Sequence, residues 1–189
     1  MSENELVERI SCKQEAAFEE LVHLYQKQVI STCYGFVGNY HDAQDVAQDV
    51  FIEVFESIEK FRREAKLSTW IYRIAVNKSI NFKRQKSRKQ WVQSIETFFG
   101  KGINEAQTVR AHKSDEPNEA LEENEKKLIL HQAIDRLPEN QRIAFTLNKF
   151  DDLSYQQIAD VMKTTLPSVE SLIHRAKINL QKYLVNYYK

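Results

Sequence analysis

The sequence of 189 residues is poor in residues that interrupt helices or cross-link chains, with four glycines, three prolines and two cysteines. Cys12 and Cys33 are isolated thiols without a CxxC pair, so the sequence predicts neither a disulfide framework nor a zinc knuckle. No apolar run approaches the length of a membrane span, and the polar, acidic amino terminus lacks the regions of a signal peptide. We therefore expect a cytoplasmic protein that does not insert into a membrane.

The patterns of enzyme active sites are also missing. There is no glycine-rich phosphate loop and no nucleophile with a matched base, so an enzyme is the least favoured class and no cofactor is expected. His41, Asp45 and Asp49 could be imagined as metal ligands, but nothing completes a ligand set, and no metal site is expected.

Charge is abundant and is sorted along the chain. The 27 basic and 27 acidic residues cancel to a formal net charge of zero. Residues 1–59 have 3 basic and 12 acidic side chains, whereas residues 60–95 have 11 and 1. Residues 96–135 have 5 and 9, and residues 136–189 have 8 and 5. Two basic segments separated by an acidic one indicate two places where a polyanion is held, and they disfavour an interaction protein with no role in nucleic-acid binding.

The most informative stretch is a basic helix predicted from Ser68 to about Lys89. At 100° per residue, its apolar face of Ile71, Ala75 and Phe82 lies about a third of a turn from a second face. That second face carries Trp70, Arg73, Asn77, Asn81, Arg84 and Arg88. Its amides suit base edges, and its guanidinium groups suit phosphates or guanine. The alternative is a solvated basic helix whose Trp70 belongs to the core.

Two amphipathic helices are predicted before this basic helix. The first contains Phe18 to Phe36 and is stopped by Gly38. The second has Asp42 as its N-cap. Its buried stripe consists of Val46, Val50, Val54, Phe55 and Ile58. Its outer face carries Asp45, Gln48, Asp49, Ile52, Glu53 and Glu56. A solvated surface is one interpretation of that outer face, and a protein-docking surface, favoured by Ile52 among the acids, is the other.

A loop from Phe61 to Leu67 connects these helices to the basic one. Ser68 is the expected cap of the basic helix, with Leu67 and Tyr72 at the positions of a hydrophobic staple. Residues 10–95 are thus expected to form one compact three-helix unit. From Glu96 to about Glu116 the sequence has no sustained periodicity, which predicts a flexible linker.

The carboxyl-terminal part predicts four helices. One runs from Pro117 to about Arg136, and Pro138 begins the next. Residues 154–162 follow with Ser154 and Gln157 in a capping box, and a longer helix runs from Leu166 to about Tyr187. A short helix, a tight turn and a longer helix describe a helix-turn-helix, although an αα-hairpin with no DNA role has the same outline. The DNA-binding interpretation is favoured by polar side chains on the last helix: Ser168, Ser171, His174, Arg175 and Lys177.

Five segments together resemble a known family. They are DAQDVAQDVFIEVF (42–55), FRREAKLSTWIYRIAVN (61–77), LPENQRIAFTL (137–147), LSYQQIADVM (153–162) and SVESLIHRAK (168–177). In this order they resemble the extracytoplasmic-function sigma factors of the bacterial sigma-70 family. The resemblance covers nearly the whole chain.

This resemblance implies an all-α protein of two small helical domains without catalytic activity. Residues 1–95 would form a three-helix or four-helix domain that binds core RNA polymerase and melts the promoter minus-ten element. Residues 96–116 would be the linker, and residues 117–189 a four-helix domain whose helix-turn-helix binds the minus-thirty-five element. The implied partners are core RNA polymerase, promoter DNA in duplex and single-stranded form, and an anti-sigma factor. A stand-alone helix-turn-helix regulator of duplex DNA is the alternative function.

The resemblance also implies roles for individual residues. The polymerase-binding face matches Asp42, Asp45, Gln48, Asp49 and Phe51, and we add the neighbouring Ile52 and Glu53. For the minus-ten strand the expected contacts are Phe61, Arg63, Lys66, Leu67, Trp70, Arg73, Asn77, Asn81, Arg84 and Arg88. For the minus-thirty-five element they are Ser168, Glu170, Ser171, His174, Arg175 and Lys177.

Some positions depart from the family pattern. The loop after Phe61 lacks a glycine that relatives commonly carry. Lys163 stands where the family turn usually has glycine, which costs roughly 1 kcal/mol if the residue is left-handed. Glu170 and Leu172 replace common basic residues, so we expect weaker phosphate binding by this helix. Glu170 either accepts a hydrogen bond from a cytosine amino group in the major groove, which we favour, or points away from DNA and pairs within the protein.

Overall fold

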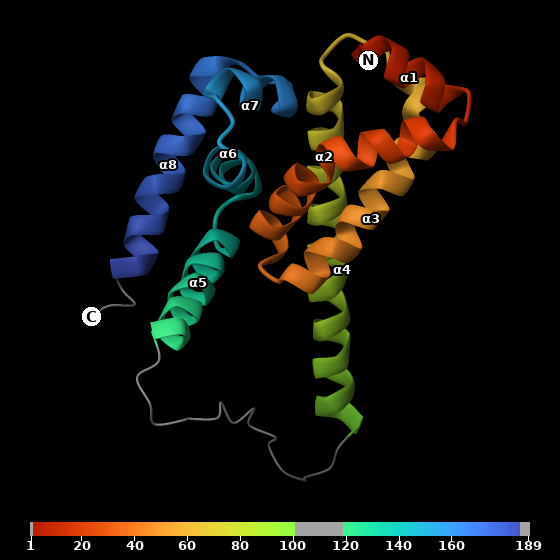
Figure 1. Cartoon of the computed structure of the whole chain (residues 1–189). Coiled ribbons are helices and arrows are strands. Elements are labelled where there is room, and N and C mark those ends of the chain that lie inside the picture. Colours follow the sequence, from red (N-terminus) through yellow and green to blue (C-terminus); the bar gives the residue numbers. More distant parts are fainter. Residues whose placement is uncertain (1, 101–118, 186–189) are drawn as a thin grey trace.

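The computed structural model of the chain describes residues 2–100 and 119–185, and all the regular elements in these ranges are helices (Figure 1). The all-α prediction is confirmed. The amino-terminal elements are α1 (Glu3–Ser11), α2 (Glu15–Val37), α3 (Tyr40–Ser57), the 3-10 turn η1 (Ile58–Lys60) and α4 (Leu67–Gly100). The carboxyl-terminal elements are α5 (Glu119–Asp135), α6 (Glu139–Phe150), α7 (Tyr155–Met162) and α8 (Leu166–Val185).

The amino-terminal domain is a bundle of α1, α2, α3 and α4. The sequence had left either three or four helices open for this domain, and the structure has four. The predicted apolar stripe of α3 lies in its core, where Val46, Val50 and Val54 are buried. Phe51 is also buried, which makes it a core residue of the bundle. Each such side chain removed from water contributes about 1.5–3 kcal/mol, so the buried stripe holds α3 firmly in the bundle.

The turn between α2 and α3 differs in one detail from the prediction. Gly38 ends α2 in the left-handed conformation, with φ of 72°, as expected for a helix C-terminus. The N-cap of α3 is Asn39, whose side-chain oxygen accepts a hydrogen bond from the Asp42 N–H at 3.0 Å. Asp42 is therefore a first-turn acid and not the predicted cap.

Both ends of α4 also differ from the prediction. The helix begins at Leu67, whose N–H donates to the Glu3 carboxylate of α1 at 2.9 Å, so Glu3 supplies a cap that was expected from Ser68. The helix continues to Gly100, well beyond the expected end near Lys89. The first residues of the expected linker are therefore helical, and the rest of it, with Pro117, lies outside the described residues.

The carboxyl-terminal domain contains the predicted helix-turn-helix, formed by α7 and α8. Ser154 and Gln157 make the reciprocal capping box at the start of α7. Lys163 lies between the helices in the left-handed conformation, with φ of 52° and ψ of 48°. A turn that favours glycine is thus built with lysine, at a cost of about 1 kcal/mol.

The two domains pack against each other, which no sequence pattern predicted. Helix α6 contacts α2 and α7 contacts α4, so the helix-turn-helix lies beside the amino-terminal half of α4 (Figure 1). A single buried cluster joins the domains: Phe36, Val76 and Ile80 from one side, Ile143, Ala144, Leu147, Leu153, Ile158, Ala159, Val161, Val169 and Ile173 from the other. We call this arrangement of the two domains the closed form.

Candidate functional site

The outer face of α3 is open to solvent. Asp45, Gln48, Asp49 and Ile52 are exposed, and the Ile52 side chain is 54% exposed. Nothing in the described parts of the carboxyl-terminal domain covers these four side chains. A partner could therefore contact this acidic face, as we name it, without any rearrangement of the chain.

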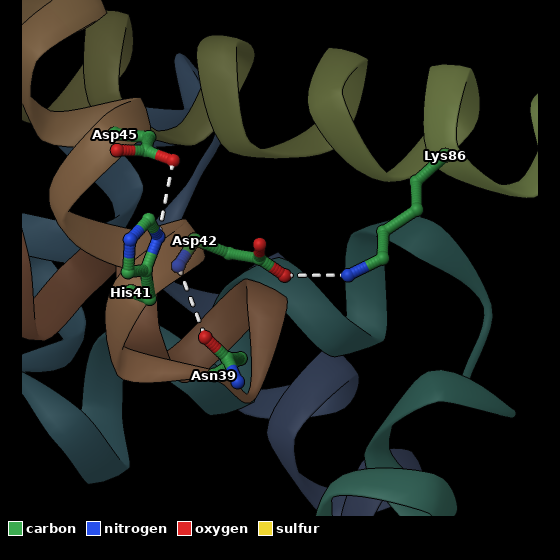
Figure 2. A network of polar contacts seen from close by, with 5 residues as sticks. All are labelled: Asn39, His41, Asp42, Asp45 and Lys86. Carbon is green, nitrogen blue, oxygen red and sulfur yellow. Dashed lines mark hydrogen bonds and ion pairs between the residues drawn. The ribbon is translucent and has the colours of Figure 1, made fainter.

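Two acids at the edge of the acidic face are tied to the basic helix α4. Figure 2 shows Asp42, whose carboxylate accepts a hydrogen bond from Lys86 Nζ at 2.5 Å. Further along α3, Glu53 pairs with Lys78 at 3.2 Å. Both acids are half-buried, so of the seven residues predicted for the polymerase-binding face these two also help to hold α3 against α4.

The metal alternative at the start of α3 is not supported by the geometry. His41 Nδ1 lies 3.3 Å from Asp45 Oδ2, which makes the two residues an exposed i, i+4 pair (Figure 2). Across residues 2–100 and 119–185, no three His, Cys, Asp or Glu side chains are placed to hold a metal ion.

The predicted polar face of α4 is a continuous stripe along the helix. Asn77, Asn81, Arg84 and Arg88 are exposed, whereas Trp70 and Arg73 are half-buried. At 1.5 Å per residue the stripe from Trp70 to Arg88 is about 27 Å long, the length of about eight stacked nucleotides. We call these six residues the basic stripe.

The loop before α4 forms a cavity next to the start of this stripe. The Phe61 and Trp70 rings lie with their centroids 5.3 Å apart, at an angle of 41°. They line a cavity of about 220 Å³ together with Arg62, Arg73 and Lys163. Phe61 is itself buried in the amino-terminal core, so the half-buried Trp70 supplies most of the accessible aromatic surface. An aromatic surface beside guanidinium groups suits an unstacked base and its phosphate, which is the chemistry expected for single-stranded DNA.

Two loop residues have structural roles that the sequence did not predict. Arg63 adopts a left-handed conformation, with φ of 59°, and pairs with Glu8 of α1 at 3.1 Å, which fixes the loop that lacks the family glycine. Leu67 is completely buried in the amino-terminal core, so its side chain is not accessible to DNA in this structure. Lys66 is exposed, as a phosphate contact requires.

In the closed form the carboxyl-terminal domain covers part of the basic stripe. The Arg73 guanidinium donates hydrogen bonds to the Asp160 carbonyl at 2.6 Å and to the Val161 carbonyl at 3.2 Å. Arg84 pairs with Glu139 of α6 at 2.7 Å. Two predicted DNA contacts are thus occupied by acceptors from the other domain.

Burial perturbs ionisable groups where the domains meet. Desolvation lowers the pKa of Lys83, although Asp135 of α5, which accepts its hydrogen bond, opposes the shift. Desolvation also raises the pKa of Asp151 to about 7, although Thr32 donates a hydrogen bond to its carboxylate. A carboxyl group with this pKa titrates in the physiological range, so we expect the packing of the two domains to depend on pH.

On α8, the predicted recognition residues lie on the outer side of the helix. Glu170, Ser171, His174, Arg175 and Lys177 are exposed, and Ser168 is half-buried. The inner side is formed by Val169, Ile173, Ala176 and Leu180, which are buried. Glu170 has no hydrogen-bond or ion-pair partner among the described residues, so the alternative that it pairs within the protein has no support here.

One exposed aromatic residue was missed from the sequence. Trp91 on α4 is 67% exposed, and it lies three residues after Arg88, in line with the basic stripe. The same 100° periodicity that selected Arg84 and Arg88 could have found it, but the predicted helix ended too early.

Comparisons with known proteins match both domains. The family model described as Sigma-70 region 2 matches residues 21–89, and that described as Sigma-70, region 4 matches residues 127–180. The RNA polymerase sigma-H factor of Pseudomonas aeruginosa is 34% identical over 185 residues, which cover 96% of this chain and 93% of that protein. The ECF RNA polymerase sigma factor SigW of Bacillus subtilis is 31% identical, with 89% of each chain covered.

Solved structures share the fold. CnrH in complex with the cytosolic domain of CnrY matches with a TM-score of 0.67 at 19% identity, covering 97% of each chain. The sigma factor RpoE in complex with the anti-sigma factor NepR from Bartonella quintana matches with a TM-score of 0.57 at 19% identity, covering 88% of this chain and 96% of that one. Within residues 2–100 and 119–185, none of the helices has the length and apolar character needed to cross a membrane.

Proposed function

Because the chain belongs to the extracytoplasmic-function sigma factors of the sigma-70 family, we propose that one of its surfaces binds RNA polymerase and that two others bind promoter DNA. It is a sigma factor that directs RNA polymerase, and sigma factors are in general initiation factors without enzymatic activity. Residues 1–95 bind polymerase and the minus-ten element, and residues 117–189 bind the minus-thirty-five element. Residues 96–116 connect the two domains. The stand-alone regulator is set aside because the relatives match along nearly the whole chain.

The acidic face of α3 binds core RNA polymerase. It is exposed, carries Asp45 and Asp49 beside the apolar Ile52, and needs no movement of the rest of the chain. A carboxylate patch around an aliphatic side chain fits a basic partner surface with an apolar centre, because opposite potentials steer the encounter while apolar burial holds the complex. Asp42 and Glu53 lie at the rim of this contact.

The basic stripe of α4, with the cavity at Phe61, holds one strand of the opened minus-ten element. This arrangement is the single observation that carries the proposal, since it combines aromatic rings, exposed amides and guanidinium groups along one line. Aromatic surfaces stack on unpaired bases, and a basic groove follows the backbone of the strand. Asn77 and Asn81 contact bases, and Arg84 and Arg88 contact phosphates.

The outer side of α8 enters the major groove at the minus-thirty-five element. Ser171, His174 and Arg175 are exposed on one side of the second helix of a helix-turn-helix, which is the side that this motif presents to base edges. Lys177 and Ser168 flank them and reach phosphates.

The chain acts in the cytoplasm without catalytic activity of its own, and an anti-sigma factor controls it. The support for that partner is a solved structure of similar fold, in which the sigma factor RpoE is bound to the anti-sigma factor NepR. The acidic face and the basic stripe are the two surfaces that an inhibitor would have to block.

The experiment that tests this function is transcription from a promoter library by core RNA polymerase, with and without the chain. We expect initiation from a defined subset of promoters only when the chain is present. A variant with Asn77→Ala and Asn81→Ala should lose most of this activity, whereas Gln132→Ala, an exposed amide on α5, should retain it. Promoter selection that is unaffected by the paired α4 substitutions would contradict the role assigned to the basic stripe.

A further inference from the structure

The last described turns of α4 carry an exposed tryptophan beyond the part of the helix that the family model matches. The match to Sigma-70 region 2 ends at residue 89, and Trp91 follows with a side chain that is 67% exposed. Burial of a tryptophan removes about 150–250 Å² from water, and this side chain leaves most of that gain unused. A single exposed apolar residue needs no function, so the position of Trp91 has to decide what it does.

Trp91 lies on the line that the basic stripe follows along α4. It comes 18 residues after Arg73, which at about 3.6 residues per turn is about five full turns, so the two side chains leave the helix in the same direction. Trp91 therefore lengthens the stripe from about 27 Å to about 32 Å. The chain has two tryptophans, and they lie at the two ends of this longer stripe, Trp70 at its start and Trp91 at its end.

Positive charge surrounds the approach to Trp91. Residues 83–91, KRQKSRKQW, include five basic side chains and no acidic one. Arg88 and Lys89 are exposed, and neither forms an ion pair with another residue in the described part of the chain. Their charges are therefore available to the phosphates of a nucleic acid that reaches this end of the helix.

The side chains around Trp91 suit a nucleobase better than the apolar surface of a protein. Ser87 and Arg88 lie about one turn before it on the same side of α4, and both are exposed and polar. Val92 is 40% exposed, but it leaves the helix about 100° away from Trp91, so the two do not share one face. An indole ring among cations can stack on an unpaired base while the cations hold the adjoining phosphates.

We propose that Trp91 is a base-stacking site for single-stranded DNA, which extends the basic stripe by one nucleotide beyond Arg88. The inference rests on the proposed role of the stripe in holding the minus-ten strand, and it adds a contact outside the family match. Trp91 lies about 4.5 Å farther along the helix than Arg88, close to the spacing of about 3.4 Å between nucleotides. A phosphate bound to Arg88 thus brings the next base to the indole ring. Every base has a π-face, so the site accepts any of the four.

The first test measures how tightly the full-length chain binds a fluorescein-labelled oligothymidylate of about 12 nucleotides, which is longer than the extended stripe. Trp91→Ala should weaken binding about tenfold because it removes the stacking surface, and Trp91→Phe should keep most of the affinity. Val92→Ala truncates the adjacent exposed residue and should match the wild type. Equal affinity of the wild type and Trp91→Ala would overturn the proposal.

The salt dependence of the same binding separates stacking from charge. Trp91→Ala should lower the affinity by the same factor at every salt concentration, because stacking releases no counterions. Arg88→Ala, which removes a phosphate contact, should reduce the slope of log K against log salt concentration by about 0.7. A reduced slope in Trp91→Ala would show that the substitution acts through the neighbouring cations, and it would overturn the stacking contact.

Fluorescence reports on the indole ring itself. In Trp70→Phe, Trp91 is the only tryptophan left in the chain. Among the described residues, the hydrogen bonds from the carboxyl-terminal domain to the stripe are at Arg73 and Arg84, so the free chain leaves Trp91 accessible to the probe. Saturating oligothymidylate should quench the emission of Trp91 and protect it from acrylamide. Emission and acrylamide quenching that stay unchanged at saturation would overturn the proposal.

The outcomes separate this inference from the function on which it rests. Asn77→Ala with Asn81→Ala should also weaken binding of the probe. If this pair weakens binding and Trp91→Ala does not, the stacking site is refuted and the role of the basic stripe remains. If neither change weakens binding, both are refuted. Loss of binding to core polymerase in Trp91→Ala, with normal binding of the probe, would assign the ring to a protein contact and refute the stacking site.

Discussion

The acidic face of α3 and the basic stripe of α4 belong to one domain, but in the closed form only the basic stripe is partly covered by the other domain. Asp45, Asp49 and Ile52 face solvent, whereas Arg73 and Arg84 are bonded to the carboxyl-terminal domain. With the roles proposed for these two surfaces, the difference predicts an order of events. The closed chain can bind polymerase through α3 directly, but it can offer the whole stripe to DNA only after the domains separate. Substitutions on either surface should therefore affect different steps of initiation.

The largest effect should come from reversing charge on the open surface. Asp45→Lys with Asp49→Lys should abolish binding to core polymerase, weakening it by a factor of about 100 or more, because like charges placed together across an interface cost several kcal/mol. Both residues are exposed, so the fold should be unchanged. A pull-down with core enzyme measures the loss.

The matched control for that experiment is Glu19→Lys with Glu20→Lys, the same change at exposed positions of α2. Far-ultraviolet circular dichroism of both variants checks the fold. Polymerase binding that survives the α3 reversal would mean that the acidic face is only a solvated surface.

The next largest effect, on promoter opening, should come from substitutions in the basic stripe of α4. Asn77→Ala with Asn81→Ala should reduce promoter opening by about tenfold or more, since each amide contact with a base contributes about 1–3 kcal/mol. Closed-complex formation should change less, because the bases become available only when the strands separate. Permanganate footprinting detects the opened strand separately from initial binding, and loss of binding with normal opening would contradict the assignment.

A smaller effect is expected at a single promoter position. Glu170 is exposed and unpaired among the described residues, so we expect its carboxylate to accept a hydrogen bond from a cytosine amino group. Glu170→Gln should then relax preference at one base of the minus-thirty-five element, by about 1–3 kcal/mol. Binding-site selection with both proteins measures it, and identical preferences at every position would refute the base contact.

The smallest effect is a pH dependence of closure. Burial raises the pKa of Asp151 to about 7 in the closed form, and separation would return it toward the ordinary 3.8. The closed form therefore binds more protons, and the stabilisation from protonating Asp151 is lost as pH rises through 7. Between pH 8 and 6.5 the closure constant should increase about fourfold from this group. The neighbouring Asp152 adds to the raised pKa, and Cys33 and Tyr72 stay neutral in this range.

His131 acts in the opposite direction. Burial lowers its pKa in the closed form, although Asp135 opposes and Lys83 supports that shift, so protonation favours separation. Over the same pH range it offsets the gain by about twofold at most, given an ordinary pKa near 6.5. Energy transfer between labels on the two domains measures closure, and Asp151→Asn should remove the closure gained on acidification. The same increase in Asp151→Asn would exclude this carboxyl group as the cause.

Local signals in the sequence predicted most of the individual helices. The capping box of Ser154 and Gln157 and the stop at Gly38 depend only on neighbouring residues, so they could be recognised directly. The cap of α3 is ambiguous in the sequence, because Asn39 and Asp42, three residues apart, offer the same chemistry. The cap of α4 could not be found, because Glu3 reaches Leu67 from a helix that lies 64 residues away in the sequence.

The candidate site was predicted only in part. Periodicity selected exposed residues of α3, α4 and α8, but it could not show that backbone carbonyl groups of α7 would occupy Arg73, since no side-chain pattern encodes them. Leu67 was assigned to DNA by resemblance, whereas packing places it in the core. Gly35 leaves the space in which Thr146 and Phe150 of α6 approach α2. A glycine within a helix does not, however, identify the surface that approaches it.

The most direct test of the contrast between the two surfaces is a titration of one promoter duplex with the free chain and with the polymerase-bound chain. The free chain has zero formal net charge and a covered stripe, so we expect it to bind far more weakly than the polymerase-bound form. Equal affinity of the free and polymerase-bound wild type would contradict a DNA surface that is closed until polymerase is bound.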